Sequence, residues 1–384
     1  MKPSIDTRTR RMGDRPDVDL WTLPWRGDDA RYLGVPPLTI EVDGRAWTLT
    51  ADGVTPGATA PLRVAIDQAA FADLVSEQRT ALGLVIAGRV VGEPEANNAF
   101  CAWDPVLRSI IDGRAVYRPG DVEVSVPLDQ RFRLGEDDDA AAHFLADAGF
   151  LLLEGVFTES EIDAIDEDLL RAVDRAEPDD GASWWAATRG GTRYPTRVLN
   201  FAEQSAALRA LLDDDRYRAI GSLLDDGHYP GDPFGEHFAD VTAEGLVKRV
   251  DSVEGLVCLP WHKDCDRGGH SMFCAGLTIG ICLTPVDDAH GGLDVTAGSH
   301  RAHIARAQVE LGLDLPIVTL RANRGDLTLH TSCTLHRSTH PVSKERRVAY
   351  TGFTLPSDER TENSAGLRQD RFAIGDPSTQ ARLG

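Results

Sequence analysis

Short segments in which apolar and polar residues alternate dominate the first third of the chain. The two-residue period of these segments is that of a half-buried β-strand, and they cover residues 38–42, 47–50 and 62–66. Asp67, a good helix-capping residue, then precedes apolar positions that recur at helical spacing up to residue 75. The pattern predicts a small α+β domain over residues 21–134, after a polar tail of residues 1–20.

The middle of the chain has helical patterns. The acidic run at residues 135–140 is typical of a solvated linker. Beyond it we expect a helix from residue 141, followed by the apolar run that starts at Phe150. Thr158 and Glu161 have the spacing of a capping box, which predicts a helix over residues 159–175.

The pattern changes again from about residue 246. Short apolar runs are separated there by Gly, Pro and Asp, which is typical of a β-sandwich or barrel rather than of alternating βαβ units. We therefore predict a fold that is mainly β with α, in which residues 141–384 form the larger domain.

The charge balance excludes several classes of partner. There are 40 Lys and Arg residues against 61 Asp and Glu residues, a net charge of −21. Nucleic-acid and anionic-membrane binding both depend on an excess of basic residues, so neither is expected. The polar start and the absence of an apolar stretch of about 20 residues predict a cytoplasmic protein with no membrane span. The six cysteines contain no Cys-x-x-Cys pair and are expected to be buried thiols.

Three residues have the chemistry of a metal site. On a strand, His262 and Asp264 would project from one face, so that both could reach one ion. His336 supplies a third ligand, although His330 competes for this role. Two imidazoles and one carboxylate leave the remaining positions of a metal open, as non-haem Fe(II) oxygenases require. Zinc accepts similar ligands, so the three residues alone do not identify the metal.

A basic residue near the end of this region could bind a carboxylate. Arg347 lies eleven residues after His336, on a segment expected to form an adjacent strand. A planar guanidinium binds a carboxylate through two parallel hydrogen bonds, as the far end of a dicarboxylate cosubstrate would need. Arg346 competes, because neighbouring strand residues face opposite sides. The spacing from His336 favours Arg347.

Residues from about 141 to 355 resemble the phytanoyl-CoA dioxygenase family of Fe(II)/2-oxoglutarate oxygenases. The matching segments, in order, are residues 149–157, 260–264, 283–300, 325–329 and 335–338, followed by Arg347. The resemblance implies a double-stranded β-helix core of the jelly-roll or cupin-like type. It also implies Fe(II) bound by His262, Asp264 and His336, 2-oxoglutarate held by Arg347, and O₂ as the second cosubstrate. The retained Asp264 favours hydroxylation or another oxidation over halogenation.

Other residues are candidates for contacts around this centre. Thr278 is expected to contact the cosubstrate, and Gly280 would enlarge the site beside it. Trp185, Arg193 and Arg197 belong to an aromatic and basic cluster that could form a substrate lid or a packed loop.

The predicted function is that of a 2-oxoglutarate-dependent non-haem iron dioxygenase. It would oxidise a C–H bond of a small molecule, of lipid, acyl or secondary-metabolite type, and release succinate and CO₂. One alternative is a metal-dependent cupin-like hydrolase or isomerase that does not use 2-oxoglutarate. Another is a non-catalytic lipid-binding protein, since residues 61–92 resemble sterol-carrier-protein-like domains. We expect a monomer or a homodimer.

Overall fold

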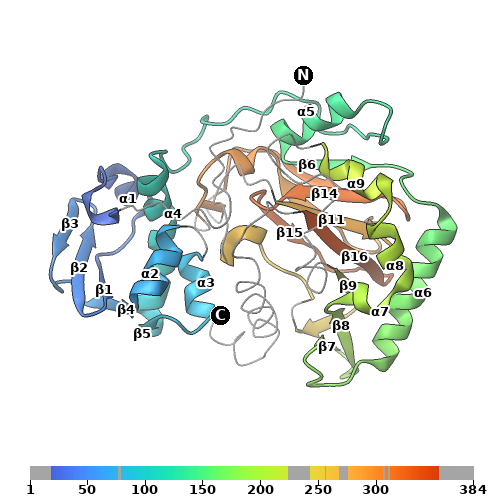
Figure 1. Cartoon of the computed structure of the whole chain (residues 1–384), viewed down its shortest axis with the longest axis horizontal. Helices are drawn as coiled ribbons and strands as arrows, with labels where there is room; N and C mark the ends of the chain where they lie inside the picture. Colours follow the sequence, from blue (N-terminus) through green and yellow to red (C-terminus); the bar gives the residue numbers. More distant parts are fainter. Residues whose placement is uncertain are drawn as a thin grey trace.

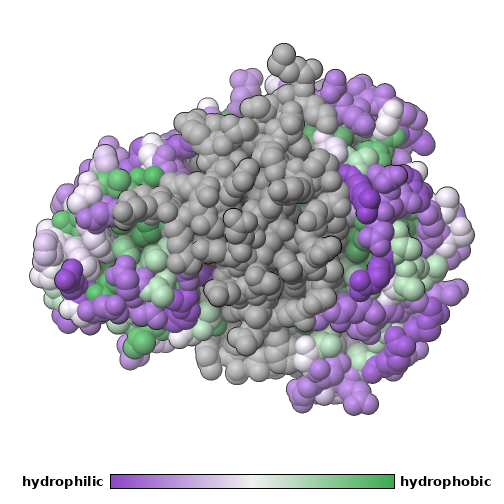
Figure 2. Space-filling model, viewed as in Figure 1, coloured by the Kyte–Doolittle hydropathy of each residue, from purple (hydrophilic) through white to green (hydrophobic). Residues whose placement is uncertain are grey.

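The computed structural model describes residues 19–76, 79–223, 243–255, 257–267, 276–305, 308–309 and 312–353. A small N-terminal unit lies beside a larger one that contains the long sheet (Figure 1). Hydrophilic side chains cover much of the coloured surface in Figure 2, as the acidic composition leads us to expect. None of the helices within these ranges is long and apolar enough to cross a lipid bilayer.

The N-terminal unit consists of one sheet and four helices with a hydrophobic core of their own. Its sheet has the order β3-β2-β1-β4-β5. The strands are β1 (Leu38–Val42), β2 (Arg45–Thr50), β3 (Gly53–Pro56), β4 (Leu62–Ile66) and β5 (Val91–Gly92). A short 3-10 helix, η1 (Leu20–Thr22), precedes the helices α1 (Gly27–Leu33), α2 (Gln68–Val75), α3 (Ala81–Ile86) and α4 (Pro94–Asp112). The predicted strands and the helix capped by Asp67 are confirmed.

The acidic run is not a linker, because it opens a helix. Helix α5 (Asp138–Ala148) begins inside the run, where the Asp137 side chain accepts a hydrogen bond from the backbone N–H of Ala140. Carboxylates at a helix N-terminus satisfy free backbone donors and oppose the helix dipole, which explains the acidic residues here. Gly149, in the left-handed conformation, then leads directly into β6 (Phe150–Leu153).

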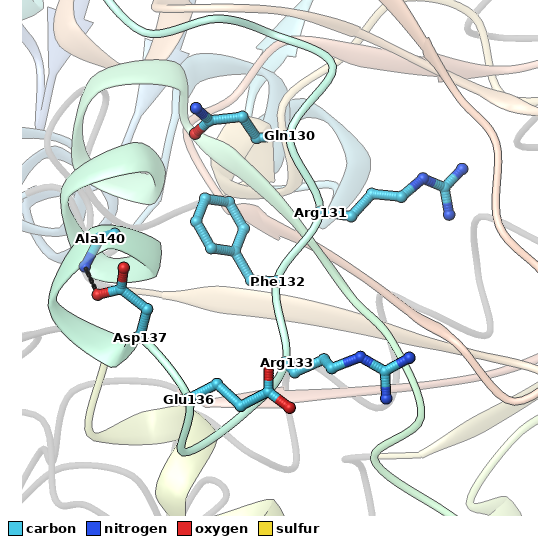
Figure 3. A pocket seen from close by; sticks show the side chains of 7 residues that line it. All are labelled: Gln130, Arg131, Phe132, Arg133, Glu136, Asp137 and Ala140. Atoms are coloured by element: carbon cyan, nitrogen blue, oxygen red, sulfur yellow. Dashed lines mark hydrogen bonds between the residues drawn. The ribbon is translucent and has the colours of Figure 1, made fainter.

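A surface hollow of about 390 Å³ lies between α5 and the extended segment before it. Figure 3 shows Phe132 pointing toward α5, whereas Arg131 and Arg133 point to the other side of the segment. Both arginines are engaged in ion pairs with Glu154. None of the residues that line this hollow is a predicted site residue.

The larger unit is built on two sheets. The eight-stranded sheet has the order β10-β7-β8-β9-β16-β11-β14-β6, and the three-stranded sheet has the order β13-β12-β15. The strands not yet given are β7 (Ser183–Thr188), β8 (Arg193–Val198), β9 (Glu244–Lys248), β10 (Ser252–Glu254), β11 (Leu277–Cys282), β12 (Leu293–Thr296), β13 (Ile317–Leu320), β14 (Leu327–Thr331), β15 (His336–Ser338) and β16 (Arg346–Phe353). All pairings of these strands are antiparallel. The mainly β, jelly-roll architecture is confirmed.

Helices cover one face of the eight-stranded sheet (Figure 1). They are α6 (Glu159–Arg175), α7 (Phe201–Gln204), α8 (Ala206–Leu212) and α9 (Asp215–Gly221), and α6 has the predicted bounds and capping box. This outer face is largely apolar, with Ile279 and Ile281 of β11 in the same buried core as Leu169 of α6. Tyr217 of α9 stacks on Phe353 of β16 at a centroid distance of 4.9 Å. The opposite, inner face carries the polar residues described next.

Candidate metal centre

Pairing between two distant segments brings the predicted metal ligands together. His262 and His336 form an isolated antiparallel bridge, with N–H to O distances of 2.9 and 3.0 Å in the two directions. The prediction that Asp264 continues a strand is wrong. Asp264 begins the 3-10 helix η3 (Asp264–Arg267) instead. The chain therefore turns directly after the bridge, and this turn carries the carboxylate toward the two imidazoles.

The ligand atoms of these residues converge. Asp264 Oδ1 lies 3.7 Å from His262 Nε2 and 3.6 Å from His336 Nε2, and the three ligand atoms all lie within 4.8 Å of one another. The other ring nitrogens face backbone carbonyls, with His262 Nδ1 2.7 Å from Pro260 O and His336 Nδ1 2.9 Å from Thr334 O. A carbonyl only accepts hydrogen bonds, so both Nδ1 atoms carry the proton and both Nε2 lone pairs are available.

The electrostatics favour the protonation states that a metal requires. Burial lowers the pKa of His336 well below its ordinary value, and the neighbouring imidazoles of His330 and His262 lower it further. Burial opposes ionisation of Asp264, but the three neighbouring imidazoles outweigh it and hold the pKa of this carboxyl well below its ordinary value. At neutral pH the centre therefore offers a neutral imidazole and a carboxylate.

Two further side chains contact the carboxylate. Thr278 does contact the centre, but through Asp264, because its hydroxyl donates to Asp264 Oδ2 at 2.5 Å. His330 is adjacent to Thr278 across the sheet, and its Nε2 lies 3.2 Å from the same oxygen. His330 is thus beside the three predicted ligands rather than in place of His336.

Arg347 is turned away from the centre, contrary to the prediction. Its guanidinium makes two hydrogen bonds to Asp166 of α6, at 2.6 and 2.9 Å, and one to Glu345 at 2.8 Å. The bond to Asp166 is the main cause of a raised pKa for Arg347. Arg347 therefore stands on the outer, helix-covered face of β16 and is occupied by two carboxylates.

Arg346 lies on the inner face instead and is fully buried. Its Nη1 donates to Gly292 O at 2.9 Å, at the start of the smaller sheet, and its Nη2 donates to the Tyr350 hydroxyl at 3.1 Å. Gly280 does not open space, because an added Cβ there would meet Thr328 Oγ1 at 2.7 Å and Tyr350 Cε1 at 3.1 Å. The glycine thus makes room for the ring that contacts Arg346.

Strand register shows that Arg346 shares its face with the metal centre. Directly opposite residues of neighbouring strands lie on one face, as do alternate residues of one strand. Thr278 is opposite Gly352, and Arg346 follows from Gly352 in steps of two. Arg346 is also opposite Lys248, which is 1% exposed. The prediction chose Arg347 by counting residues from His336. The strand register shows that this count was wrong by one residue, because Arg346 is the arginine that faces the metal centre.

The predicted substrate residues separate into two groups. Arg197 reaches the inner face, where it pairs with Glu244 and lies 5.1 Å from the ring of Trp184. Trp185 is only partly buried and donates to Ser183 Oγ at 2.9 Å, and Arg193 is exposed. Trp184, which belongs to the same predicted aromatic and basic cluster, is 7% exposed and lies opposite Arg197 in the strand register.

Four buried polar atoms of the inner face have no hydrogen-bond partner among the described residues. They are Trp184 Nε1, Arg197 Nε, His330 Nδ1 and Arg346 Nε. Buried polar groups are normally paired with protein, water or ligand. These four unpaired atoms lie on the face that also carries the buried cationic side chains of Lys248 and Arg346. Such a face is suited to bind a polar, anionic ligand rather than to form an apolar core.

Comparisons with known proteins give the family. The family model for phytanoyl-CoA dioxygenase (PhyH) matches residues 145–349, which is more than half of the chain. No curated protein sequence matches this chain.

Several solved structures are similar to this one. They include AviO1 from Streptomyces viridochromogenes Tue57, with 19% identity over 61% of this chain and 98% of that one, and a TM-score of 0.44. EctD from S. alaskensis with bound Fe has 17% identity over 62% and 83% of the two chains, and a TM-score of 0.45. SnoN, an alpha-ketoglutarate-dependent epimerase from nogalamycin biosynthesis, has 19% identity over 57% and 82%, and a TM-score of 0.42. On the family match, this chain belongs to the phytanoyl-CoA dioxygenase family of Fe(II)- and 2-oxoglutarate-dependent enzymes.

Proposed function

We propose that this protein is a dioxygenase that uses Fe(II), 2-oxoglutarate and O₂ to oxidise a C–H bond of a small molecule. The observation that carries the proposal is the convergence of His262 Nε2, His336 Nε2 and Asp264 Oδ1 within 4.8 Å, with both imidazoles in the tautomer that can bind a metal. Two imidazoles and one carboxylate are the donor set of non-haem Fe(II) oxygenases and leave positions for a cosubstrate and O₂.

The proposed anchor for the far carboxylate of 2-oxoglutarate is Arg346 rather than Arg347. Arg346 is buried beside Lys248, whose Nζ contacts Cys258 Sγ at 3.6 Å. Burial, and then the charge of Arg346, lower the pKa of Lys248 to about 7. Two buried cationic groups side by side are costly unless an anion compensates them. A dicarboxylate would do so, through the guanidinium of Arg346 and the adjacent ammonium.

With the cofactors bound, the metal centre would supply the oxidising chemistry, which converts 2-oxoglutarate and O₂ to succinate and CO₂ as the substrate is oxidised. The chain contributes ligand geometry and an anchored cosubstrate. Trp184 and Arg197 are the members of the predicted aromatic and basic cluster that lie on the inner face with little exposure, whereas Arg193 is exposed, and we place Trp184 and Arg197 toward bound ligands. A lipid, acyl or secondary-metabolite substrate fits this proposal.

The range of outcomes is wider than hydroxylation. Two of the similar structures are named as an alpha-ketoglutarate-dependent epimerase and a carbocyclase. We propose hydroxylation, epimerisation and ring closure as the outcomes to distinguish, by mass spectrometry of the product. We also propose that the N-terminal unit, whose core covers residues 20–110, is a sterol-carrier-like domain that binds an apolar ligand or another copy of the chain. The rest of the predicted domain does not belong to this core, because residues 116–134 pack on the larger unit.

The rival function is that of a metal-dependent hydrolase or isomerase that uses the same three ligands without 2-oxoglutarate. Anaerobic titration with Fe(II) and then 2-oxoglutarate separates the two, because chelation of Fe(II) by the keto acid produces a visible charge-transfer band. We expect this band in the wild-type protein, and succinate formation when O₂ is admitted. Metal binding with neither band nor succinate would support the rival. His262→Ala should abolish the band, and Arg347→Met, which alters only the outer face, should retain it.

A further inference from the structure

We infer that His330 is a positioning residue which, together with Thr278, holds Asp264 so that a single carboxylate oxygen faces the metal. The inference rests on the proposed metal centre and adds to it a constraint on how the carboxylate binds. Neither residue is one of the three metal ligands.

The two oxygens of Asp264 have separate environments. Oδ2 accepts a hydrogen bond from the Thr278 hydroxyl at 2.5 Å and lies 3.2 Å from His330 Nε2. Oδ1 lies 3.7 Å from His262 Nε2 and 3.6 Å from His336 Nε2. One oxygen is therefore occupied by protein donors, and only the other points to the place where the two ligand imidazoles converge.

The groups that hold Oδ2 are more rigidly placed than the carboxylate itself. Asp264 begins a 3-10 helix of four residues, and its side chain is 33% exposed. His330 is 2% exposed in β14, between Thr278 of β11 and Phe150 of β6. Its ring also lies 4.1 Å from the ring of His336, at an angle of 49°. A ligand on a short turn is thus held by two side chains from central strands.

His330 is not itself placed to bind the metal. A carboxylate oxygen only accepts hydrogen bonds, so the Nε2 that faces Oδ2 carries the hydrogen and has no free lone pair. The lone pair is then on Nδ1, which is buried and has no partner among the described residues. His336 differs in this respect, because its Nδ1 proton is directed to Thr334 O and its Nε2 is left for the metal.

The arrangement has a consequence for cosubstrate binding. Two imidazoles and one carboxylate oxygen leave three positions of an octahedral ion, two for the chelating keto acid and one for O₂. A carboxylate that rotated to bind through both oxygens would take one of them. By holding Oδ2, His330 and Thr278 keep that position available. Their loss should therefore weaken 2-oxoglutarate binding more than metal binding.

The experiment compares His330→Phe, which fills a similar volume without a donor, with His330→Gln, which keeps an N–H donor. Both are measured alone and with Thr278→Val. Thr328→Val is the matched control, because Thr328 lies two residues away on the same face of β14 and its hydroxyl is 3.5 Å from Gly280 O instead. The readouts are metal affinity, the Co(II) d–d spectrum, the 2-oxoglutarate affinity from the charge-transfer band, and the melting temperature of the apoprotein. The Co(II) spectrum reports the change of donor set when the second carboxylate oxygen replaces a water on the ion.

We expect His330→Phe to lower 2-oxoglutarate affinity by about 10- to 100-fold, to change the Co(II) spectrum and to change metal affinity less. His330→Gln should restore most of the loss, and Thr278→Val should add to it. Unchanged spectra and 2-oxoglutarate affinity in His330→Phe would overturn the inference. So would loss of all metal binding in both His330 variants with unchanged melting temperatures, because His330 would then be a ligand. Failure of the wild type to bind Fe(II) would instead refute the proposed function.

Discussion

Replacing Arg346 tests both the proposed cosubstrate site and the assignment of the two faces of β16. Arg346→Met removes a guanidinium that is fully buried on the inner face, where it contacts Gly292 O and the Tyr350 hydroxyl through one nitrogen each. Arg347→Met is the matched control, because it removes the same group from the next residue, whose partners Asp166 and Glu345 lie on the outer face.

Arg346→Met should mainly lower the affinity for 2-oxoglutarate, whereas Arg347→Met should affect only the stability of the fold. Truncating one partner of a buried, hydrogen-bonded charge pair costs about 2–5 kcal/mol of binding free energy. At about 1.4 kcal/mol per tenfold, Arg346→Met should raise the dissociation constant of 2-oxoglutarate by roughly 30- to 3,000-fold. Arg347→Met should leave that constant unchanged and lower the free energy of unfolding by about 1–2 kcal/mol, since its ion pair with Asp166 is partly exposed.

The assay is anaerobic titration of the Fe(II)-loaded protein with 2-oxoglutarate, accompanied by urea unfolding of each variant. If Arg346→Met does not fold, Arg346→Lys replaces it in the experiment, because lysine keeps the charge but lacks the planar pair of donors. We expect Arg346→Lys to bind 2-oxoglutarate with an affinity between those of the wild type and Arg346→Met. The reasoning about the two faces would be refuted if Arg347→Met lost 2-oxoglutarate affinity while Arg346→Lys kept it.

Three further outcomes follow from the same structure. His336→Ala should abolish Fe(II) binding with little change in the far-ultraviolet circular dichroism spectrum, and tight binding by this variant would contradict the metal centre. Burial lowers the pKa of Lys248 from 10.5 to about 7. Between pH 7 and pH 10.5 the unfolded chain therefore binds more protons than the folded chain. The free energy of unfolding should rise with pH by about 3–5 kcal/mol across this window and stay constant below it. Lys248→Met should remove this rise in urea titrations at several pH values and stabilise the protein at pH 7; an unchanged slope would show that another group is responsible. Gly149 has φ +82°, and an added Cβ would lie 2.4 Å from His300 Nδ1 and 2.6 Å from Thr334 Oγ1. Gly149→Ala should therefore lower the free energy of unfolding by about 2–4 kcal/mol. A melting temperature equal to that of the wild type would argue against this close approach.

Local patterns in the sequence were sufficient for many elements of the fold. The bounds of α6 agree with the prediction because its capping box and its 3.6-residue period are both local. Strand β4 alternates visibly for a similar reason, since Val64 and Ile66 are buried while Arg63 between Leu62 and Val64 is exposed. The residue types and order of His262, Asp264 and His336 likewise indicated a metal centre, because few donor sets serve this chemistry.

The side of a strand that each residue occupies was decided only by tertiary structure. Arg346 and Arg347 are chemically identical neighbours, and a one-residue shift of register exchanges their faces. That register depends on pairing of β16 with β9 and β11, which lie far away in the sequence. The contacts of Thr278 and His330 with Asp264 have the same origin, because three segments of the chain must meet before the carboxylate has any partner to bind. Sequence therefore determined which chemical groups are present, whereas strand pairing determined which of them face one another.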